Sequence, residues 1–224
     1  MYDNTTFILL VMNCQKYRSK ALRQKELWLN KLTCIPYYHV LADPELVTNE
    51  KEYLFDEREH ILWVKTQDDY NSLPNKVIAS YHACVSEFAK LKYVFKTDDD
   101  QICKINDPNK FFTTLTSSLS STNVIPEKYH YGGDIVDVPT PYLSQYHQIH
   151  PELPTHLPVM NTKYCSGRFY ILSKEAIHDL LKKRHYIEEE YLEDYAIGYH
   201  LSAKYKQYIK KILSNMFFED IEEN

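Results

Sequence analysis

The stretch KYVFKTDDDQIC, Lys92–Cys103, decides how the rest of the chain is interpreted. Tyr93, Val94 and Phe95 begin an apolar run that is typical of a buried strand. Three consecutive aspartates, Asp98–Asp100, follow this run directly. Adjacent carboxylates repel one another, so the arrangement calls for a compensating partner. The carboxyl ends of strands in open α/β sheets are also where ligands commonly bind.

Apolar runs alternate with helical patterns along the chain, which predicts an α/β fold with a mainly parallel sheet flanked by helices. The expected strands are residues 6–12, 35–42, 60–65, 93–97 and 168–173. The expected helices are residues 18–32, 72–88, 107–119 and 173–184, with a last helix from about 191 to 212. No internal repeat interrupts this alternation, so we expect a single domain.

Composition and charge exclude several classes of protein. The net charge is -5 and no basic stripe is present, which argues against nucleic-acid binding. The five cysteines are scattered and form no C-x-x-C motif, which favours free thiols in a reducing compartment. The apolar run at residues 7–12 is too short to span a membrane. We therefore expect a cytoplasmic protein without a membrane segment, and its 20 Tyr against 4 Gly hint at a viral or protist source.

Residues 126–158 contain six of the ten prolines and four of the ten histidines. A possible strand, YGGDIVDV at 131–138, interrupts this otherwise irregular segment. Long structured loops in compact domains are usually functional, so we expect a loop that faces a substrate. Its candidate ligand-facing aromatic residues are Tyr131, Tyr142 and Tyr146. Its histidines His147, His150 and His156 have a spacing that matches no zinc motif, so a loop that simply carries histidines is the simpler interpretation.

The aspartates admit three interpretations. In an extended chain Asp98 and Asp100 face one way and Asp99 the other, so Asp98 and Asp100 can form an oxygen site for Mg²⁺ or Mn²⁺. An acidic surface turn also favours aspartate. The haloacid-dehalogenase-type phosphatases use a D-x-D motif with an aspartate nucleophile, but they require Thr or Val where Ile102 stands here.

Two further motifs favour the metal interpretation. YCSGRFYILS, Tyr164–Ser173, and LEDYAIG, Leu192–Gly198, follow KYVFKTDDD in that order. Together the three resemble the motifs of the β-1,3-glycosyltransferase family (glycosyltransferase family 31), which includes galactosyltransferases, N-acetylglucosaminyltransferases and fringe-like enzymes. Weaker matches at DYNSLPNKV, residues 69–77, and RSKALRQKELW, residues 18–28, extend the resemblance to roughly residues 6–218.

The resemblance implies a GT-A fold, a Rossmann-like nucleotide-diphospho-sugar transferase architecture. Residues 1–224 would form one catalytic domain, with a nucleotide-sugar-binding half at about 1–105 and an acceptor-binding half at about 106–224. The implied reaction is the metal-dependent, inverting transfer of a hexose or N-acetylhexosamine from a UDP-sugar to a glycan hydroxyl, in β-1,3 linkage. Mn²⁺ or Mg²⁺ would be the cofactor, and the partners would be the UDP-sugar and a glycan or glycosylated acceptor. The alternative is a sugar- or nucleotide-binding protein with the same fold but no turnover.

The resemblance also implies roles for single residues. The metal site would be Asp98 and Asp100, and the donor-binding residues would be Asp98, Asp99, Lys76 and Arg23. The acceptor-binding residues would be Tyr164, Gly167, Arg168 and Glu193. Asp194 would be the base that takes the proton of the acceptor hydroxyl. It begins a predicted helix, whose dipole favours an ionised carboxylate, whereas Glu188–Glu190 act in the opposite direction.

The chain departs from the family pattern at two places. Arg168-Phe169 replaces the small x-Gly pair of the family motif, and we expect these bulky residues to reshape the floor of the acceptor pocket. The last histidine is His200, within the predicted final helix, so the C-terminal histidine ligand of many GT-A enzymes is absent or replaced. Glu219 and Asp220 are candidate replacements, unless they belong to a frayed acidic tail. Animal family members are Golgi enzymes, so the Golgi lumen is the alternative location if a membrane anchor was removed.

Overall fold

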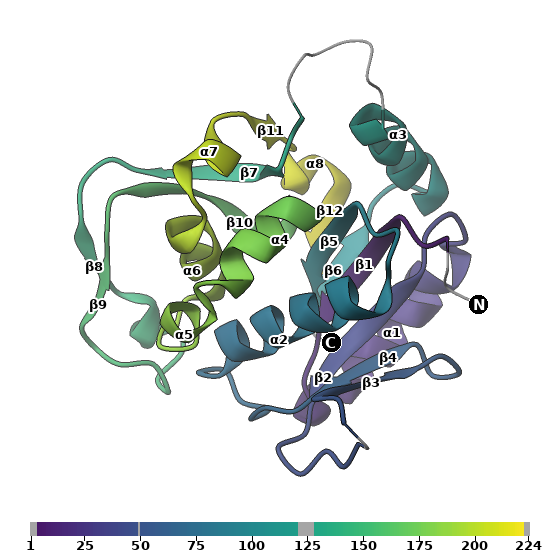
Figure 1. Ribbon diagram of the computed structural model, residues 1–224, viewed down its shortest axis with the longest axis horizontal. Coiled ribbons are helices and arrows are strands. Elements are labelled where there is room, and N and C mark those ends of the chain that lie inside the picture. The colour runs from purple at the N-terminus through teal and green to yellow at the C-terminus, as the bar shows by residue number, and fades with distance from the viewer. Residues whose placement is uncertain (1–3, 49, 121–127, 222–224) are drawn as a thin grey trace.

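The computed structural model describes residues 4–48, 50–120 and 128–221. An eight-stranded sheet lies at its centre, with strand order β11-β7-β10-β5-β1-β2-β4-β3 (Figure 1). Its strands are β1 (Phe7–Met12), β2 (Tyr37–Ala42), β3 (Tyr53–Asp56), β4 (Ile61–Val64), β5 (Tyr93–Asp98), β7 (Tyr131–Val138), β10 (Thr162–Ser173) and β11 (Ile209–Lys211). The pairs β1–β2, β1–β5, β2–β4 and β7–β11 are parallel, and β10 is antiparallel to both neighbours. The predicted mainly parallel α/β architecture is therefore confirmed.

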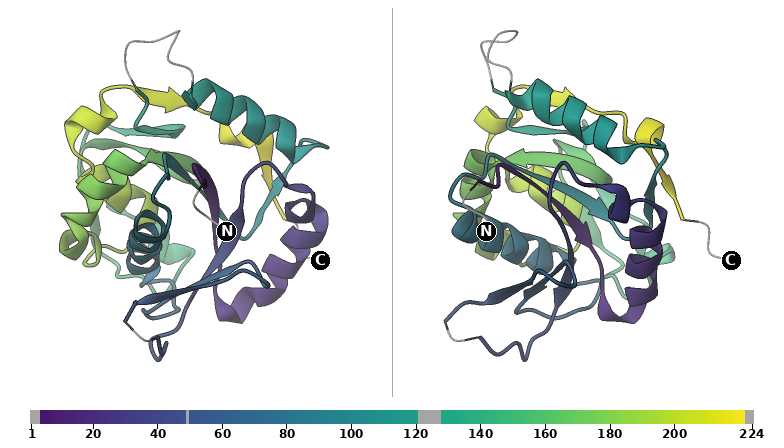
Figure 2. Two further views of the ribbon diagram at one scale, coloured as in Figure 1. Left: turned by 45° about the vertical axis from the view of Figure 1, so that its right-hand side comes forward. Right: turned by 90° about the vertical axis from the view of Figure 1, so that its right-hand side faces the viewer.

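Helices cover both faces of this sheet (Figure 2). They are α1 (Arg18–Leu27), α2 (Leu73–Glu87), α3 (Pro108–Ser120), α4 (Lys174–Leu181), α5 (Arg184–Ile187), α6 (Glu193–His200), α7 (Ala203–Lys206) and α8 (Ser214–Phe217). One core packs α2, α4, α5 and α6 against the sheet. The other core is largely aromatic and packs Trp28, Phe112 and Phe218 against the opposite face. Because the central strands are buried on both faces, they are apolar throughout rather than alternating.

The last predicted helix is wrong beyond His200. Helix α6 ends there, because Leu201 has extended backbone dihedrals, φ -65° and ψ 127°. Asp179 then accepts a hydrogen bond from the Ser202 amide at 2.9 Å, and the Lys183 ammonium donates to the His200 carbonyl at 2.6 Å. These contacts from an earlier segment redirect the chain into α7 and β11. The apolar residues of the sequence therefore keep helical spacing beyond His200, although the helix itself ends there.

The predicted irregular loop is more ordered than expected. Its first two residues, 126 and 127, lie outside the described residues, and the expected strand at 131–138 is β7. Beyond β7 the chain forms a two-stranded antiparallel excursion, β8 (Tyr142–Ser144) with β9 (Leu157–Val159). Figure 1 shows this excursion extending from the edge where β7 and β10 end.

A second small sheet supports the end of β5. It pairs β6 (Gln101–Cys103) with β12 (Phe218–Asp220) in antiparallel register. The Ile221 amide also donates to the Asp100 carbonyl at 2.6 Å. Segments far apart in the sequence therefore meet beside the three aspartates.

Candidate active site

The three aspartates lie at the carboxyl end of β5, as the sequence predicted, but they do not alternate between two faces. Asp98 ends the strand, whereas Asp99 and Asp100 form a turn that leads into β6. The Asp99 carboxylate accepts a hydrogen bond at 2.5 Å from the side-chain amide of Asn13, the residue that follows β1. The Asp100 carboxylate accepts one from the Gln101 side chain at 2.7 Å. The prediction of extended geometry is wrong because the strand ends at Asp98, two residues earlier than that alternation requires.

A buried lysine joins this strand end to α6. Lys96 lies on β5 two residues before Asp98, so the two side chains share a face of the sheet. Its ammonium, 1% exposed, lies 2.6 Å from Asp98 Oδ1 and 2.9 Å from Glu193 Oε2. It also donates to the Gly167 carbonyl at 3.0 Å. Although burial lowers the pKa of Lys96, the charges of Asp98 and Glu193 raise it above its ordinary value, so the ammonium is charged.

Glu193 is enclosed by this network. It is 5% exposed, and the Tyr170 hydroxyl donates to its Oε1 at 2.5 Å while Lys96 contacts Oε2. Tyr170 in turn hydrogen-bonds to Tyr81 on α2 at 2.6 Å. Both oxygens of Glu193 therefore have protein partners. The acceptor-binding role of Glu193 stays a prediction. In the structure Glu193 holds the Lys96 ammonium in place.

A bulge in β10 brings Asp194 to the same place. The register of β10 against β7 shifts between Cys165 and Tyr170, which displaces Gly167 from regular pairing. The Gly167 amide donates to Asp194 Oδ2 at 3.0 Å. A Cβ atom on Gly167 would lie 3.4 Å from the Lys96 ammonium, 3.5 Å from Asp98 Oδ2 and 3.6 Å from Asp194 Oδ2. Gly167 thus lies between Asp98 and Asp194, close to a carboxylate oxygen of each.

The position of α6 depends on a second glycine. A Cβ atom on Gly198 would lie 2.2 Å from the Cβ of Tyr164 on β10, so only glycine permits this approach. Asp194 occupies the first turn of α6, as predicted, and its Oδ1 accepts a hydrogen bond from the Tyr195 amide at 2.8 Å. Tyr164 is half-buried, and its ring contacts that of Tyr195 edge to face at 6.1 Å.

The expectation that Phe169 helps to form the floor of the acceptor pocket is wrong, whereas the acceptor-binding role of Arg168 stays a prediction. Phe169 is fully buried in the aromatic core, where it stacks on Phe218 at 4.9 Å. Arg168 extends to β12 and contacts both oxygens of Asp220, at 2.9 and 3.0 Å. The Gln101 amide group bridges Asp220 and Asp100, at 2.8 and 2.7 Å. Asp220 therefore belongs to an ordered strand beside the aspartate turn rather than to a frayed tail.

The predicted donor residues lie around the same end of the sheet. Lys76 on α2 is 2% exposed, and its ammonium contacts the Asn13 carbonyl at 2.8 Å and Asp68 at 2.5 Å. It holds together the segments that follow β1 and β4. Arg23 lies half-buried on α1. Its neighbour Gln24 is fully buried and donates to the carbonyl of Asp98 at 2.9 Å. The donor-binding roles of Lys76 and Arg23 stay predictions.

The excursion after β7 supplies aromatic rings near the carboxylates. His150 stacks on Tyr70 at 4.1 Å and on Tyr146 at 5.2 Å, so this histidine is part of a ring stack. Burial raises the pKa of Tyr146, and the charges of Asp194 and Asp98 add to that effect. Tyr131 is fully buried and its hydroxyl accepts the Cys165 amide hydrogen bond, so the prediction that it faces a ligand is wrong.

Carboxylates dominate the electrostatics of the strand end. Withdrawal from water raises the pKa of Asp98 to about 6, and the charge of Glu193 adds to this effect. Withdrawal from water and the charges of Asp100 and Asp98 raise the pKa of Asp99 to about 7. Within the described residues, no three His, Cys, Asp or Glu side chains are arranged to hold a metal ion. Two carboxylates with phosphate oxygens form a usual Mg²⁺ donor set, and the metal-binding roles of Asp98 and Asp100 stay predictions.

Sequence reasoning missed Lys96, Gln24 and Asn13, which position the turn. A signal was present for Lys96, since a lysine inside an apolar strand is almost never fully buried without a partner. The sequence gave no signal that Gln24 has a structural role. It lies in a mostly polar helix, and its side-chain amide donates to backbone carbonyls.

Comparison with known proteins places the chain in a family. It matches the galactosyltransferase family over residues 45–210. That range is well over half of the chain, so the protein belongs to the galactosyltransferase family, and the resemblance stated from the motifs is confirmed at this level. No curated protein sequence matches the chain closely enough to count as a relative.

Two solved structures are similar to the chain. One is a glycosyltransferase involved in the glycosylation of the major capsid of PBCV-1, with 12% sequence identity, a TM-score of 0.42, and coverage of 82% of this chain and 65% of that one. The other is the mannosyltransferase Ktr4p from S. cerevisiae, with 12% identity, a TM-score of 0.39, and coverage of 89% and 66%. The chain thus spans slightly less than two thirds of either structure. Among the described residues, no helix has both the length and the apolar character needed to cross a membrane.

Proposed function

We propose that the protein is a glycosyltransferase that moves a hexose or N-acetylhexosamine from a UDP-sugar to a glycan hydroxyl, with inversion and in β-1,3 linkage. The observation that supports this most is the meeting of Asp98 with Asp194 around Gly167, in a member of the galactosyltransferase family. These groups come from β5, from the bulge of β10 and from the start of α6. Their convergence supplies negative charge for a cation and a separate carboxylate for a proton.

Asp194 is the proposed base. Two backbone amides, those of Gly167 and Tyr195, donate to its oxygens and fix its orientation. Burial raises the pKa of Asp194, which makes it a stronger base than an exposed aspartate, while Lys96 and the two amides act against that shift. Asp194 accepts the proton of the acceptor hydroxyl as that oxygen attacks the sugar. The bond from the sugar to the UDP oxygen breaks, and UDP leaves with its electron pair.

Asp98 and Asp100 are the proposed carboxylates for Mn²⁺ or Mg²⁺. A bound divalent cation supplies charge that stabilises the departing diphosphate. The protein's contribution is to hold the two carboxylates: Lys96 orients Asp98, and Gln101 orients Asp100 against β12. Glu219 and Asp220 stay the candidate replacements for a C-terminal histidine ligand, and Asp220 lies across Gln101 from Asp100. Cytoplasmic location remains a prediction.

Release of UDP tests the proposal. With Mn²⁺ and a panel of UDP-galactose, UDP-N-acetylglucosamine and UDP-glucose, the full chain should release UDP slowly to water and faster when an acceptor glycan is added. Nucleotide detection by a coupled assay measures both rates. Binding of every UDP-sugar by calorimetry without any release, with or without acceptors, would contradict transfer and favour a binding protein with the same fold.

Asp100→Asn is expected to remove the coupling between metal and nucleotide. In the wild type, UDP with Mn²⁺ at about one hundred times the dissociation constant should stabilise the fold by about 2.7 kcal/mol, or roughly 5–10 °C in melting temperature. The variant should lose this shift. Without metal it should melt no lower than the wild type, because a repelling charge is removed while the oxygen that accepts from Gln101 is kept. Asp107→Asn, an exposed aspartate before α3, is the control and should keep the shift.

A further inference from the structure

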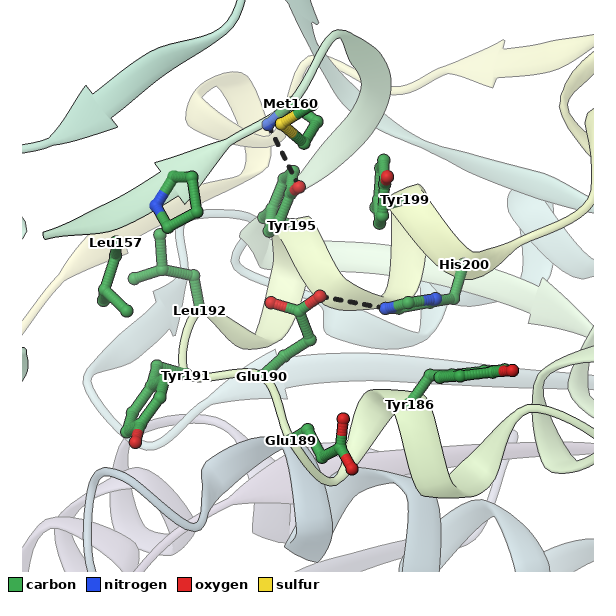
Figure 3. A pocket seen from close by; sticks show the side chains of 11 residues that line it. Leu157, Met160, Tyr186, Glu189, Glu190, Tyr191, Leu192, Tyr195, Tyr199 and His200 are labelled. Atoms are coloured by element: carbon green, nitrogen blue, oxygen red, sulfur yellow. Dashed lines mark hydrogen bonds and ion pairs between the residues drawn. The ribbon is translucent and has the colours of Figure 1, made fainter.

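A pocket on the side of α6 away from Gly167 has no part in the function proposed above. It lies between α6, the segment that follows α5, and β9, and its volume is about 390 Å³ (Figure 3). That volume falls within the range of small-molecule sites. Tyrosine rings, two carboxylates and the apolar side chains of Leu157, Pro158, Met160 and Leu192 line it together.

Four of its aromatic side chains form two parallel pairs. Tyr195 stacks with Tyr199 at 5.3 Å and 18°, and Tyr186 stacks with His200 at 6.0 Å and 7°. Tyr186 and Tyr199 are 53% and 38% exposed, so a large part of their surface has no covering side chain. Exposed aromatic surface gathered around a pocket marks a binding site more often than scattered rings do. The electron-rich faces of such rings attract the C–H groups of a sugar ring.

The polar groups of the pocket suit hydroxyls. Figure 3 shows Glu190 between the rings of the pocket, with Glu189 beside it. Oε1 of Glu190 lies 3.0 Å from Nε2 of His200. Carboxylates accept hydrogen bonds from hydroxyls, and tyrosine hydroxyls both donate and accept. Within the part of the chain that the structure describes, no Lys or Arg lines the pocket. This excess of acceptors disfavours phosphate or carboxylate ligands and favours a neutral polyhydroxyl compound.

The pocket is connected to the proposed base through one residue. Tyr195 lines the pocket, its amide donates to Asp194 at 2.8 Å, and its ring contacts Tyr164 at 6.1 Å. We propose that the pocket is a subsite for a neutral sugar of the glycan acceptor, distinct from the sugar whose hydroxyl reacts at Asp194. The identity of the ligand as part of an acceptor rests on the proposed function, whereas its chemical class rests on the pocket alone.

Saturation-transfer NMR with N-acetyllactosamine and chitobiose tests the binding. The wild-type chain should transfer saturation to both disaccharides, and Tyr186→Ala/Tyr199→Ala should reduce the signal at least fivefold. Both rings are exposed, so the fold should survive their removal. Tyr208→Ala, which removes a similarly exposed tyrosine (43%) outside the pocket, is the matched control and should bind as the wild type does. Tyr199→Leu keeps apolar surface but no ring, so it should also lose binding.

Kinetics separate this inference from the proposed function. The double variant should lower kcat/KM for a disaccharide acceptor about tenfold, while acceptor-free release of UDP stays unchanged. A chain that binds the disaccharides but never releases UDP would overturn the transferase and leave the pocket supported. Equal disaccharide binding by the wild type and the double variant would overturn the subsite. Binding of tetralysine together with no binding of either disaccharide would also overturn the subsite, because that result would identify a cation site.

Discussion

Asp194→Asn is expected to lower the rate of sugar transfer by about 10²–10⁴-fold, the usual contribution of a general base. Asparagine keeps the shape of the side chain and one oxygen, but it does not accept the proton of the acceptor hydroxyl. Binding of the UDP-sugar and of Mn²⁺ should change little, since these depend on the β5 aspartates in the proposed mechanism. Steady-state kinetics at saturating donor and calorimetric titration of UDP measure the two quantities separately.

Asp137→Asn is the matched control for this variant. Asp137 lies on β7, is 56% exposed, and pairs only with Lys163 on the surface among its described contacts. Its loss should leave transfer within twofold of the wild type. Glu193→Gln is a poor control, because Glu193 is buried against Lys96 and its replacement should lower stability as well. Transfer by Asp194→Asn at a rate near that of the wild type would exclude Asp194 as the base.

Lys96→Met is expected to destabilise the protein by about 3–5 kcal/mol, the cost of removing one partner from a buried ion pair. Methionine fills much of the volume but leaves Glu193 buried with only the Tyr170 hydroxyl as a partner. Asp98 is about one-third exposed, so water compensates part of its loss. Urea unfolding of the full chain measures the change. Lys92→Met, an exposed lysine one position before β5, should stay within about 0.5 kcal/mol.

A double variant distinguishes the ion pair from simple packing. Lys96→Met/Glu193→Gln removes the buried charge as well as its partner, and the glutamine oxygen still accepts from Tyr170. It should therefore be more stable than Lys96→Met alone, because the two side chains are in contact and their effects are not additive. Additive losses would show that Lys96 stabilises the fold through its packing.

Much of the architecture follows from local signals. The apolar run of β5 and the aspartates behind it predicted both the central strand and the location of the candidate site. Proline and serine at the start of α2, and Ser173 at the start of α4, marked helix starts that the structure confirms. Asp194 was correctly placed at the start of a helix because its motif and the following apolar spacing agree.

The remaining features depend on contacts that have no local pattern. The chain after His200 keeps helical spacing, yet Asp179 and Lys183 redirect it, and its Ile209–Lys211 segment pairs with β7 instead. The short strand β12 was not foreseen because its partner β6 lies far upstream. A turn at the aspartates was one of the alternatives that the sequence left open, because a turn and an extended strand end look alike in sequence.

The pairing of β12 with β6 makes the aspartate turn depend on residues that are synthesised late. The hydrogen bond from Gln101 to Asp220 joins residues 119 positions apart. Because a chain is made from its N-terminus, β1, β5 and α2 are available before residues 218–221. A nascent chain can therefore complete the support of Asp100 only after residues 218–221 have been added.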